Sequence, residues 1–281
     1  MAQGRAAALQ ALKAAAVVGD RVRARAPGVV VLIYHRVGAR AQTEIDLPAD
    51  EFERQMAWLA ETGRAVDIDT AVARLARREP AEVAEVAEGS PDPVVVTFDD
   101  GTSDLAEVAL PILARHQVPA TVYLATQYVD EQLAWPADGV PLSWAGAREM
   151  VDSGLVTIGS HTHSHALLDR LSPDEAAEEL DRSRGLVHDN LGVAADHFAY
   201  PKAVAPPSAV ERVVRDRFVS ASLGGNRPNP YSRTDLHRLA RTAVQVSDGW
   251  SYFQRKAEGG MALEDTVRRA LNRVRYRRAT G

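Results

Sequence analysis

The sequence predicts an α/β fold in which helices pack around a mostly parallel sheet. Short runs of β-branched and other apolar residues alternate along the chain with longer segments of helical periodicity, and this alternation is typical of βα units. No internal repeat and no shift in composition divides the 281 residues. Because α/β barrels commonly use this length for one domain, we predict a single domain.

The predicted elements can be justified in chain order. Val29–Tyr34 is the first strand, and the helix after it, over about 49–61, has an apolar face and Gly63 at its end. The long helix that follows Ser172 has a serine cap, a proline at its first position and Glu175 at its third. The other predicted elements are strands at 94–98, 120–125, 155–160, 197–200, 218–221 and 239–244 and helices at 105–116 and 144–153.

Two irregular stretches, residues 127–142 and 223–234, contain Pro, Gly and Asn and are predicted as loops at the rim of the domain.

The composition excludes several classes of partner and site. The net charge of −5 gives no basic field, so nucleic acid is excluded as a partner. The absence of cysteine excludes disulfides, thiolate metal sites and a cysteine nucleophile.

The first residues predict an alanine-rich amphipathic helix with a basic face, over about residues 6–25. Asp20 interrupts the short apolar run 14–18, so no signal peptide is recognisable, and no stretch approaches the roughly 18 apolar residues of a membrane span. We therefore expect an N-terminal helix in residues 1–27, the main domain in 28–281, and a cytoplasmic chain. The helix either packs on the domain or makes peripheral contact with a membrane or a partner.

Two of the predicted strands end in groups that bind divalent metals. One strand runs into Asp99 and Asp100, and another runs into His161 and His165. Neutral imidazoles and a carboxylate are common ligands of such metals, and catalytic zinc sites keep three protein ligands and an open position for water. Adjacent residues of a strand point to opposite faces. Asp99 and Asp100 can therefore serve one site only if the strand ends there, and Gly101 is consistent with a break.

These motifs resemble those of the polysaccharide deacetylase family, carbohydrate esterase family four. The motifs are Thr-Phe-Asp-Asp-Gly at 97–101, Ser-His-Thr-x-x-His at 160–165 and Phe-x-Tyr-Pro at 198–201. The resemblance covers residues 29–246, and the leading Tyr-His-Arg-Val at 34–37 is similar to the subgroup that includes exopolysaccharide N-deacetylases. It implies a distorted (β/α)7 barrel with the site at the C-terminal ends of the strands.

The resemblance also implies the chemistry. Asp100, His161 and His165 would bind a divalent metal, foremost Zn2+ with Co2+, Ni2+ or Mn2+ as alternatives, and Asp99 would be the general base. The metal would activate water and polarise the acetyl oxygen. The implied enzyme is a metal-dependent hydrolase of carbon–nitrogen bonds. It would remove N-acetyl groups from amino-sugar units of a polysaccharide, or of a glycoside or lipid-linked precursor, in exopolysaccharide biosynthesis. His163 is expected to point away from the metal.

The general acid is predicted at an early position. Many family members carry a late Leu-x-x-His, but His237 is out of phase for that motif here, and the same pattern occurs as Leu32-Ile33-Tyr34-His35. In a closed barrel the first and last strands are neighbours. We therefore predict His35 as the acid that protonates the leaving amine, with a structural or orienting role as the alternative.

The third motif departs from the family pattern. The arginine that commonly orients the base is absent from it, and Lys202-Ala203 replaces an aromatic-glycine pair. Tyr200 and Lys202 are still assigned to the catalytic machinery, because the backbone amide after the proline would help to hold the oxyanion. The Lys202 ammonium would favour an anionic substrate, or would simply be solvated.

Three aromatic residues are candidates for substrate binding. Trp144 would wall the acetyl pocket or pack in the core, and Trp135 and Tyr128 would stack on sugar faces from a rim loop. Six arginines in residues 263–278 predict a solvated helix face or a contact with anionic lipid or a phosphate-bearing substrate. Two other functions stay open: a hydrolase of a linear or cyclic non-sugar amide, and a carbohydrate-binding family member without catalysis.

Overall fold

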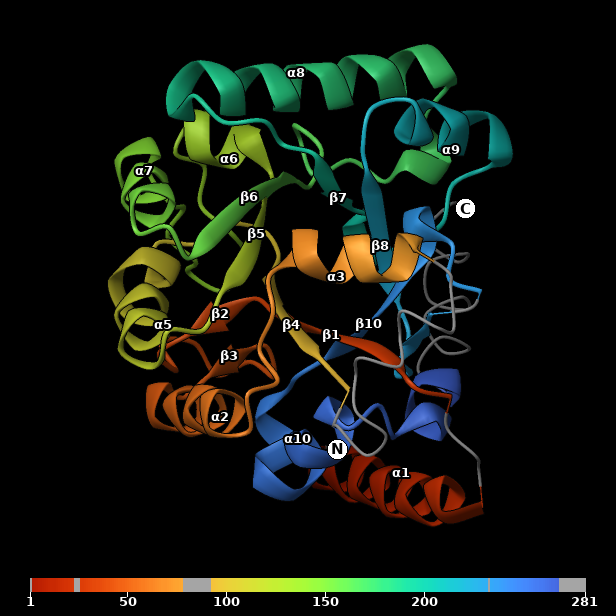
Figure 1. Cartoon of the computed structure of the whole chain (residues 1–281). Helices are drawn as coiled ribbons and strands as arrows, with labels where there is room; N and C mark the ends of the chain where they lie inside the picture. The colour runs from red at the N-terminus through yellow and green to blue at the C-terminus, as the bar shows by residue number, and fades with distance from the viewer. Residues whose placement is uncertain (1, 23–25, 78–91, 232, 268–281) are drawn as a thin grey trace.

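Seven parallel strands close into a barrel in the computed structural model, which describes residues 2–22, 26–77, 92–231 and 233–267 (Figure 1). In spatial order the strands are β1 (Gly28–Tyr34), β4 (Val94–Phe98), β5 (Ala120–Leu124), β6 (Val156–Ser160), β7 (His197–Ala199), β8 (Ser220–Gly224) and β10 (Leu239–Ala243). Pairing of β10 with β1 closes the barrel. The predicted single-domain, distorted (β/α)7 barrel is confirmed.

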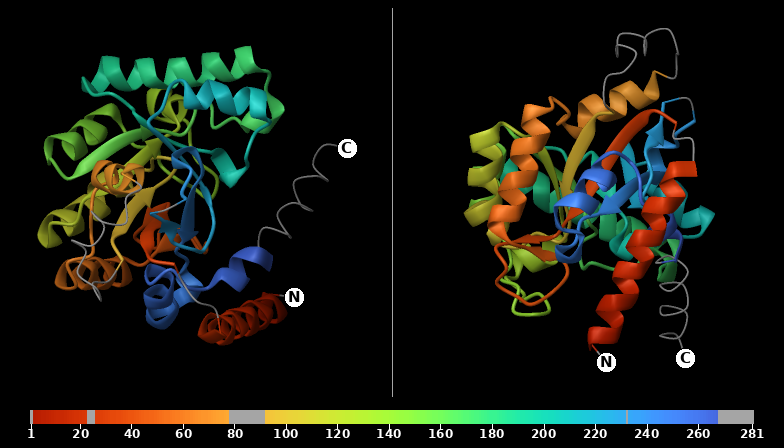
Figure 2. Two further views of the ribbon diagram at one scale, coloured as in Figure 1. Left: turned by 45° about the vertical axis from the view of Figure 1, so that its right-hand side comes forward. Right: turned by 90° about the horizontal axis from the view of Figure 1, so that it is seen from below.

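Helices surround the barrel, and one of them, α3, lies across its N-terminal end (Figures 1 and 2). They are α1 (Ala2–Val22), α2 (Ala49–Glu61), α3 (Ile68–Ala76), α5 (Leu110–His116), α6 (Thr126–Asp130), α7 (Trp144–Asp152), α8 (Pro173–Leu191), α9 (Ser208–Arg215) and α10 (Gly249–Ala257). Short strands are β2 (Arg36–Val37), β3 (Asp46–Leu47) and β9 (Asn229–Pro230). Single 3-10 turns lie at Leu168–Arg170, Pro201–Ala203, Leu236–Arg238 and Val246–Asp248.

Most predicted boundaries agree with these elements, and the exceptions have local causes. The predicted helix 105–116 begins as a π-helical turn, Leu105–Ala109, because Pro111 has no N–H to donate to the preceding turn. The predicted strand 218–221 begins later, at Ser220, because the Phe218 amide donates to the Val214 carbonyl at the end of α9. The capping box of Ser172 and Glu175 is present at the start of α8.

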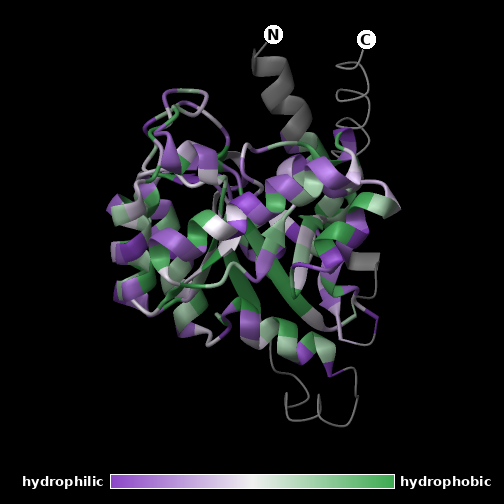
Figure 3. Cartoon of the chain, turned by 90° about the horizontal axis from the view of Figure 1, so that it is seen from above, coloured by the Kyte–Doolittle hydropathy of each residue, from purple (hydrophilic) through white to green (hydrophobic). Residues whose placement is uncertain are grey.

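The barrel interior changes character along the strands. At the N-terminal ends, Val29, Val31 and Val95 pack inside the barrel against apolar residues of α3. Two residues further along the same face, strand alternation brings polar side chains inward, among them Thr97 and then Asp99. The other strand face packs outward against α2, α5 and α7, so apolar residues line the strands at the centre of the molecule and polar ones the outer helix faces (Figure 3). The polar end of the interior is therefore the C-terminal end.

The N-terminal helix packs on the domain beside the last described helices (Figure 2). Lys13 and Ala16 are buried there, and the Lys13 ammonium forms an ion pair with Asp248. Within the described part of the chain, no helix has both the length and the apolar character needed to cross a membrane. Residues 262–267, at the beginning of the C-terminal tail, are helical. The six arginines of that tail lie outside the described residues.

Candidate active site

The candidate site lies where β4 and β6 end. Asp99 and Asp100 follow β4, and the backbone then turns, with φ of 75° at Asp100 and 94° at Gly101. The positive φ favours glycine at this turn, and a Cβ atom on Gly101 would also lie 2.7 Å from a methyl carbon of Leu124 and force that side chain to move. The predicted strand break is present, and it lets two consecutive carboxylates approach the same histidines.

Asp100, His161 and His165 form a triangle of ligand atoms. One oxygen of Asp100 lies 3.6 Å from His161 Nε2 and 3.4 Å from His165 Nε2, and the three ligand atoms all lie within 4.8 Å of one another. Ligands about 2.0–2.1 Å from a tetrahedral zinc ion are about 3.4 Å apart. The donor types and spacings therefore fit one divalent ion with three protein ligands.

The surroundings of His161 and His165 keep both imidazoles neutral, which is the state that binds a metal. His161 Nδ1 lies 2.7 Å from the Ala199 carbonyl, which can only accept, so Nδ1 carries the proton and Nε2 presents its lone pair to the site. Burial lowers the pKa of His161 to about 4 and that of His165 to about 3. Both imidazoles are therefore neutral near neutral pH. Asp100 and His165 stay 15% and 12% exposed, so solvent reaches the site from their side.

The loop between the two histidines is fixed from outside the barrel. The Glu179 carboxylate on α8 accepts hydrogen bonds from the amides of His163 and Ser164, at 3.0 and 2.9 Å, and from the Ser164 hydroxyl at 2.8 Å. His163 itself is buried, and its Nδ1 lies 3.1 Å from the Thr126 hydroxyl. Glu179 was not found from the sequence. The sequence does contain an indication of this role, because Glu179 falls on the inward side of a helix that is predicted to pack on the domain.

Asp99 is held by an arginine from the last strand. Arg241 on β10 donates to both carboxylate oxygens of Asp99, at 2.6 and 2.9 Å, and also to the Thr97 hydroxyl at 3.1 Å. Burial alone would raise the pKa of the Asp99 carboxyl, but attraction to Arg241 and His161 together with these hydrogen bonds holds that pKa well below its ordinary value. Asp99 is therefore ionised near neutral pH.

Arg241 corrects one expectation. The sequence indicated that no arginine orients the base, because the third motif lacks one, whereas the structure supplies an arginine from β10 through closure of the barrel. A signal was present in the sequence: an arginine in the middle of a strand of small and apolar residues, 239–244, needs a buried partner of opposite charge.

His35 lies next to Asp99 in the barrel. The register pairs Tyr34 of β1 with Phe98 of β4, so the residues that follow, His35 and Asp99, stand at the same level. His35 is also close enough for its charge to act on the pKa values of Asp99 and His161. The position that the early motif predicted for a general acid is therefore beside the candidate base, and its role stays a prediction.

The third-motif residues divide into two groups. The Tyr200 ring is buried among residues of β7, α8 and α9, outside the barrel, and its amide donates to the Ser222 carbonyl at 3.1 Å. Its side chain packs the helices onto the strands, and this position gives no support to a catalytic role. Lys202 is exposed at the rim, in a left-handed conformation with φ of 55°. Burial of His165 is the largest cause of its lowered pKa, and the positive charge of Lys202 lowers that pKa further.

The predicted aromatic residues reach the site unequally. Trp135 is buried, stacks on the Tyr128 ring at 3.7 Å between centroids, and meets the His165 ring edge-to-face at 5.4 Å. Trp135 thus forms a wall beside a candidate metal ligand, and Tyr128 covers its other side. Trp144 packs against the core and donates through Nε1 to Asp130 at 3.0 Å. A substrate-binding role for these three residues stays a prediction.

Fold and site together define a (β/α)7 barrel with a two-histidine, one-aspartate cluster at the C-terminal ends of its strands. Residues 87–216 match the family model of polysaccharide deacetylases. The matched residues contain Asp99, Asp100, His161 and His165. His35 and Arg241 lie outside the matched range, His35 directly after β1 and Arg241 on β10, the two strands that close the barrel.

Known proteins are similar over larger parts of the chain. IcaB from Ammonifex degensii is 26% identical with a TM-score of 0.67, covering 84% of this chain and 98% of that one. PplD, a deacetylase of Streptococcus pyogenes solved with acetate, shares the fold at 20% identity and a TM-score of 0.65, covering 83% and 99%. YxkH of Bacillus subtilis (strain 168), whose name proposes a polysaccharide deacetylase, is 24% identical over 173 residues, which are 61% of this chain but only 55% of that protein.

Proposed function

We propose that this protein is a metal-dependent hydrolase that removes N-acetyl groups from amino-sugar units of a polysaccharide or of its glycoside or lipid-linked precursor. The observation that carries the proposal is the triangle of Asp100, His161 and His165 beside a carboxylate, Asp99, that Arg241 keeps ionised. The match to the polysaccharide deacetylase family model supports the same chemistry, and the Tyr-His-Arg-Val motif at 34–37 supports a role in exopolysaccharide biosynthesis.

Amide hydrolysis needs a nucleophilic water, a polarised carbonyl, a site for the developing oxyanion and a proton for the leaving amine. A divalent ion bound by Asp100, His161 and His165 would supply the first two by lowering the pKa of water and acting as a Lewis acid. We assign that ion as zinc, with cobalt, nickel and manganese as alternatives, because two neutral imidazoles and a carboxylate suit all four.

The chain's own residues take the remaining steps. Asp99, ionised and oriented by two hydrogen bonds from Arg241, accepts a proton from the attacking water. His35, at the same level of the barrel, donates a proton to the leaving amine. The backbone amide of Lys202 stabilises the negative charge on the acetyl oxygen. Trp135 limits the space beside His165.

Acetate release from N-acetylglucosamine oligomers tests the proposal. Zinc-loaded wild type should release acetate, and chelated protein, Asp99→Asn and His165→Ala should not. Asp189→Asn and His188→Ala make the same chemical changes at exposed positions of α8 and should keep full activity. Loaded protein that binds one ion per chain but releases no acetate would contradict the proposal, and an acetamide-containing substrate panel without sugars would then test hydrolysis of another amide.

A further inference from the structure

We propose that a cavity at the N-terminal end of the barrel binds a ligand through a phosphate group. The cavity has a volume of about 630 Å³ and lies between the end of α1, residues 227–230 and 233–238, and the residues that follow α10. β9, which lines it, pairs with the first residues of β1, whereas the candidate active site lies beyond the last residues of the strands. The proposal therefore goes beyond the deacetylase site and does not depend on it.

Buried polar contacts hold two walls of this cavity. The Asn229 side chain donates to the carbonyls of Val29 and Ala240, at 3.1 and 2.9 Å, and accepts from the Ala240 amide at 2.8 Å. This ties the segment that contains β9 to the start of two barrel strands. Asp20, near the end of α1, accepts from the Met261 amide at 2.8 Å. Because the walls are fixed before a ligand arrives, little ordering opposes binding.

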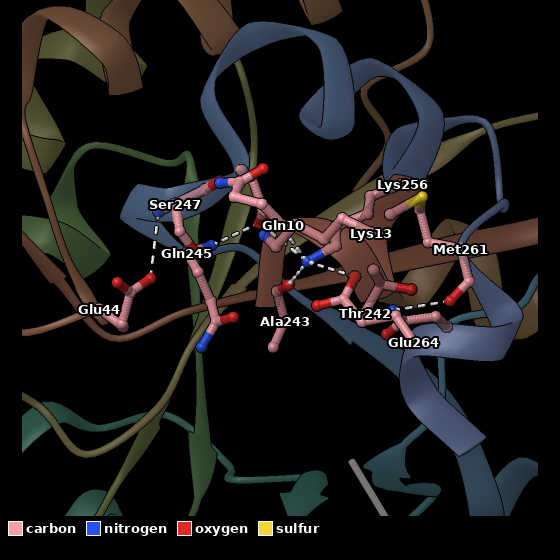
Figure 4. A network of polar contacts seen from close by, with 12 residues as sticks. Gln10, Lys13, Glu44, Thr242, Ala243, Gln245, Ser247, Lys256, Met261 and Glu264 are labelled. Carbon is pink, nitrogen blue, oxygen red and sulfur yellow. Dashed lines mark hydrogen bonds and ion pairs between the residues drawn. The ribbon is translucent and has the colours of Figure 1, made fainter. Parts of the chain in front are cut away.

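A buried ionic network fixes α1, which supplies the third wall (Figure 4). The side chains of Lys13, Asp248, Lys256 and Glu264 are fully buried, and two ammonium groups there balance two carboxylates. Lys256 lies 2.8 Å from Asp248 and 3.5 Å from Glu264, and it donates to the Ala243 carbonyl at 2.9 Å. The network thus joins α1 to α10 and to the helical residues 262–267, and it sets where Asp20 lies.

Several arginines that line the cavity are available to bind an anionic ligand. Two of its charged groups are engaged in ion pairs: Arg238 with Glu211, and Asp235 with Arg215. Arg227, Arg233 and Arg255 also line it, and among the described residues these three arginines have no ion-pair partner. The opposing carboxylates are Glu258, which is exposed, and Asp20, which already accepts from a backbone amide. The available charge is therefore positive.

Arginine chemistry and the cavity volume indicate the ligand class. Guanidinium groups bind phosphate oxygens with paired, charge-assisted hydrogen bonds. The volume exceeds that of a lone ion and falls in the range of sites for small organic molecules, about 300–1,000 Å³. We therefore infer a ligand that carries a phosphate or pyrophosphate on a larger group, such as a phosphorylated metabolite or a lipid headgroup.

Calorimetric titration with pyrophosphate tests the site in the full chain. We expect saturable binding at one site per chain, weakened at least about tenfold in the double variant Arg227→Ser/Arg255→Ser. The control variant Arg148→Ser/Arg212→Ser removes the same charge from exposed helix positions outside the cavity and should bind like wild type. Equal weakening in both variants, or no saturable binding to wild type, would overturn the proposal. Thermal unfolding midpoints should agree among the three proteins, which excludes misfolding as the cause.

Vesicle sedimentation distinguishes the two sources of the phosphate. Vesicles of phosphatidylcholine with phosphatidic acid should pull down wild type and the control variant but not the cavity variant if the ligand is a lipid headgroup. Equal sedimentation of the two variants, together with selective pyrophosphate binding, would assign a water-soluble phosphate ligand to the cavity. Failure of acetate release would leave both measurements unaffected, because neither uses the candidate active site.

Discussion

Arg241 and Asp99 form a buried ion pair whose members come from strands far apart in sequence. Arg241 is 1% exposed and Asp99 is 8% exposed, so neither charge can replace its partner with bulk solvent. Removing one member leaves the other charged in a site of low polarity, which is more costly than the pair itself is stabilising.

Arg241→Gln should therefore lower the free energy of unfolding by about 3–5 kcal/mol. In the Asp99→Asn background the same substitution should cost much less, since no charge is left unpaired. Urea unfolding of the four proteins measures this coupling. Equal costs in the two backgrounds would mean that the carboxylate is not the partner that Arg241 stabilises.

Glu179 acts on the metal ligands through the loop that carries them. Its carboxylate accepts from two loop amides and a hydroxyl, and no other residue makes these contacts in the described structure. Glu179→Ala should weaken zinc binding by about tenfold or more, the effect common for residues that support metal ligands. Calorimetric zinc titration measures it, and Glu178→Ala, one position earlier and exposed, is the matched control. Wild-type affinity in Glu179→Ala would show that the loop keeps its shape unaided.

At the scale of elements, α9 is attached to the end of the barrel through charge. The Glu211 carboxylate accepts hydrogen bonds from Arg238, the residue before β10, and from Arg215 on its own helix. The bond from Arg238, with the one from Arg215, lowers the pKa of Glu211 from 4.5 to about 2. A carboxyl whose pKa is lower in the folded state stabilises the fold above its unfolded pKa, and this contribution disappears as the pH falls toward the folded pKa.

Glu211→Gln should accordingly destabilise the protein near neutral pH, and the deficit relative to wild type should shrink as the pH falls from about 4.5 to 2. Urea unfolding at several pH values measures the difference between the two proteins. Glu178→Gln, an exposed carboxyl, serves as the reference for general charge effects. A deficit that does not change with pH would indicate that packing, and not ionisation, makes Glu211 stabilising.

The elements also show where local sequence is sufficient. The limits of α2 and β4 and the capping box of α8 agree with prediction, because each depends on residues within a few positions. The helices α3, α6, α9 and α10 were not predicted, and α6 lies almost entirely in the stretch 127–142 that was expected to be an irregular loop. They are only five to nine residues long, and short segments owe their stability to the surface that they cover.

At the scale of the whole molecule, the N-terminal helix is part of the barrel's packing. Lys13 is fully buried and forms an ion pair with Asp248, which Lys256 also contacts. Whether residues 1–27 and 28–281 are separable units stays a prediction, and stability measurements decide it.

We expect one unfolding transition for the full chain, with α1 included. Lys13→Ala should lower the free energy of unfolding by about 3 kcal/mol, because Asp248 loses a buried partner. Gln10→Ala, one turn earlier on an exposed face, should cost less than about 0.5 kcal/mol. Chemical denaturation measures both. An unchanged stability in Lys13→Ala would show that α1 detaches without cost and is a separate unit.

The sequence by itself determined the α/β class, the strand ends that carry Asp99, Asp100, His161 and His165, and through its motifs the resemblance to polysaccharide deacetylases. These features follow from residues close together in the chain, where hydrophobic period, caps and spacing act locally. Only the tertiary structure decided that Arg241 orients Asp99, that Glu179 holds the histidine loop, and that Tyr200 packs outside the barrel. Each depends on which strand lies beside which when the barrel closes, and on which face of a strand or helix is then buried. Asp99 and Arg241 lie 142 positions apart, and even the 16 positions between His163 and Glu179 separate a loop from a helix. The local sequence therefore does not say which partner each residue meets, because the fold alone brings the two elements together.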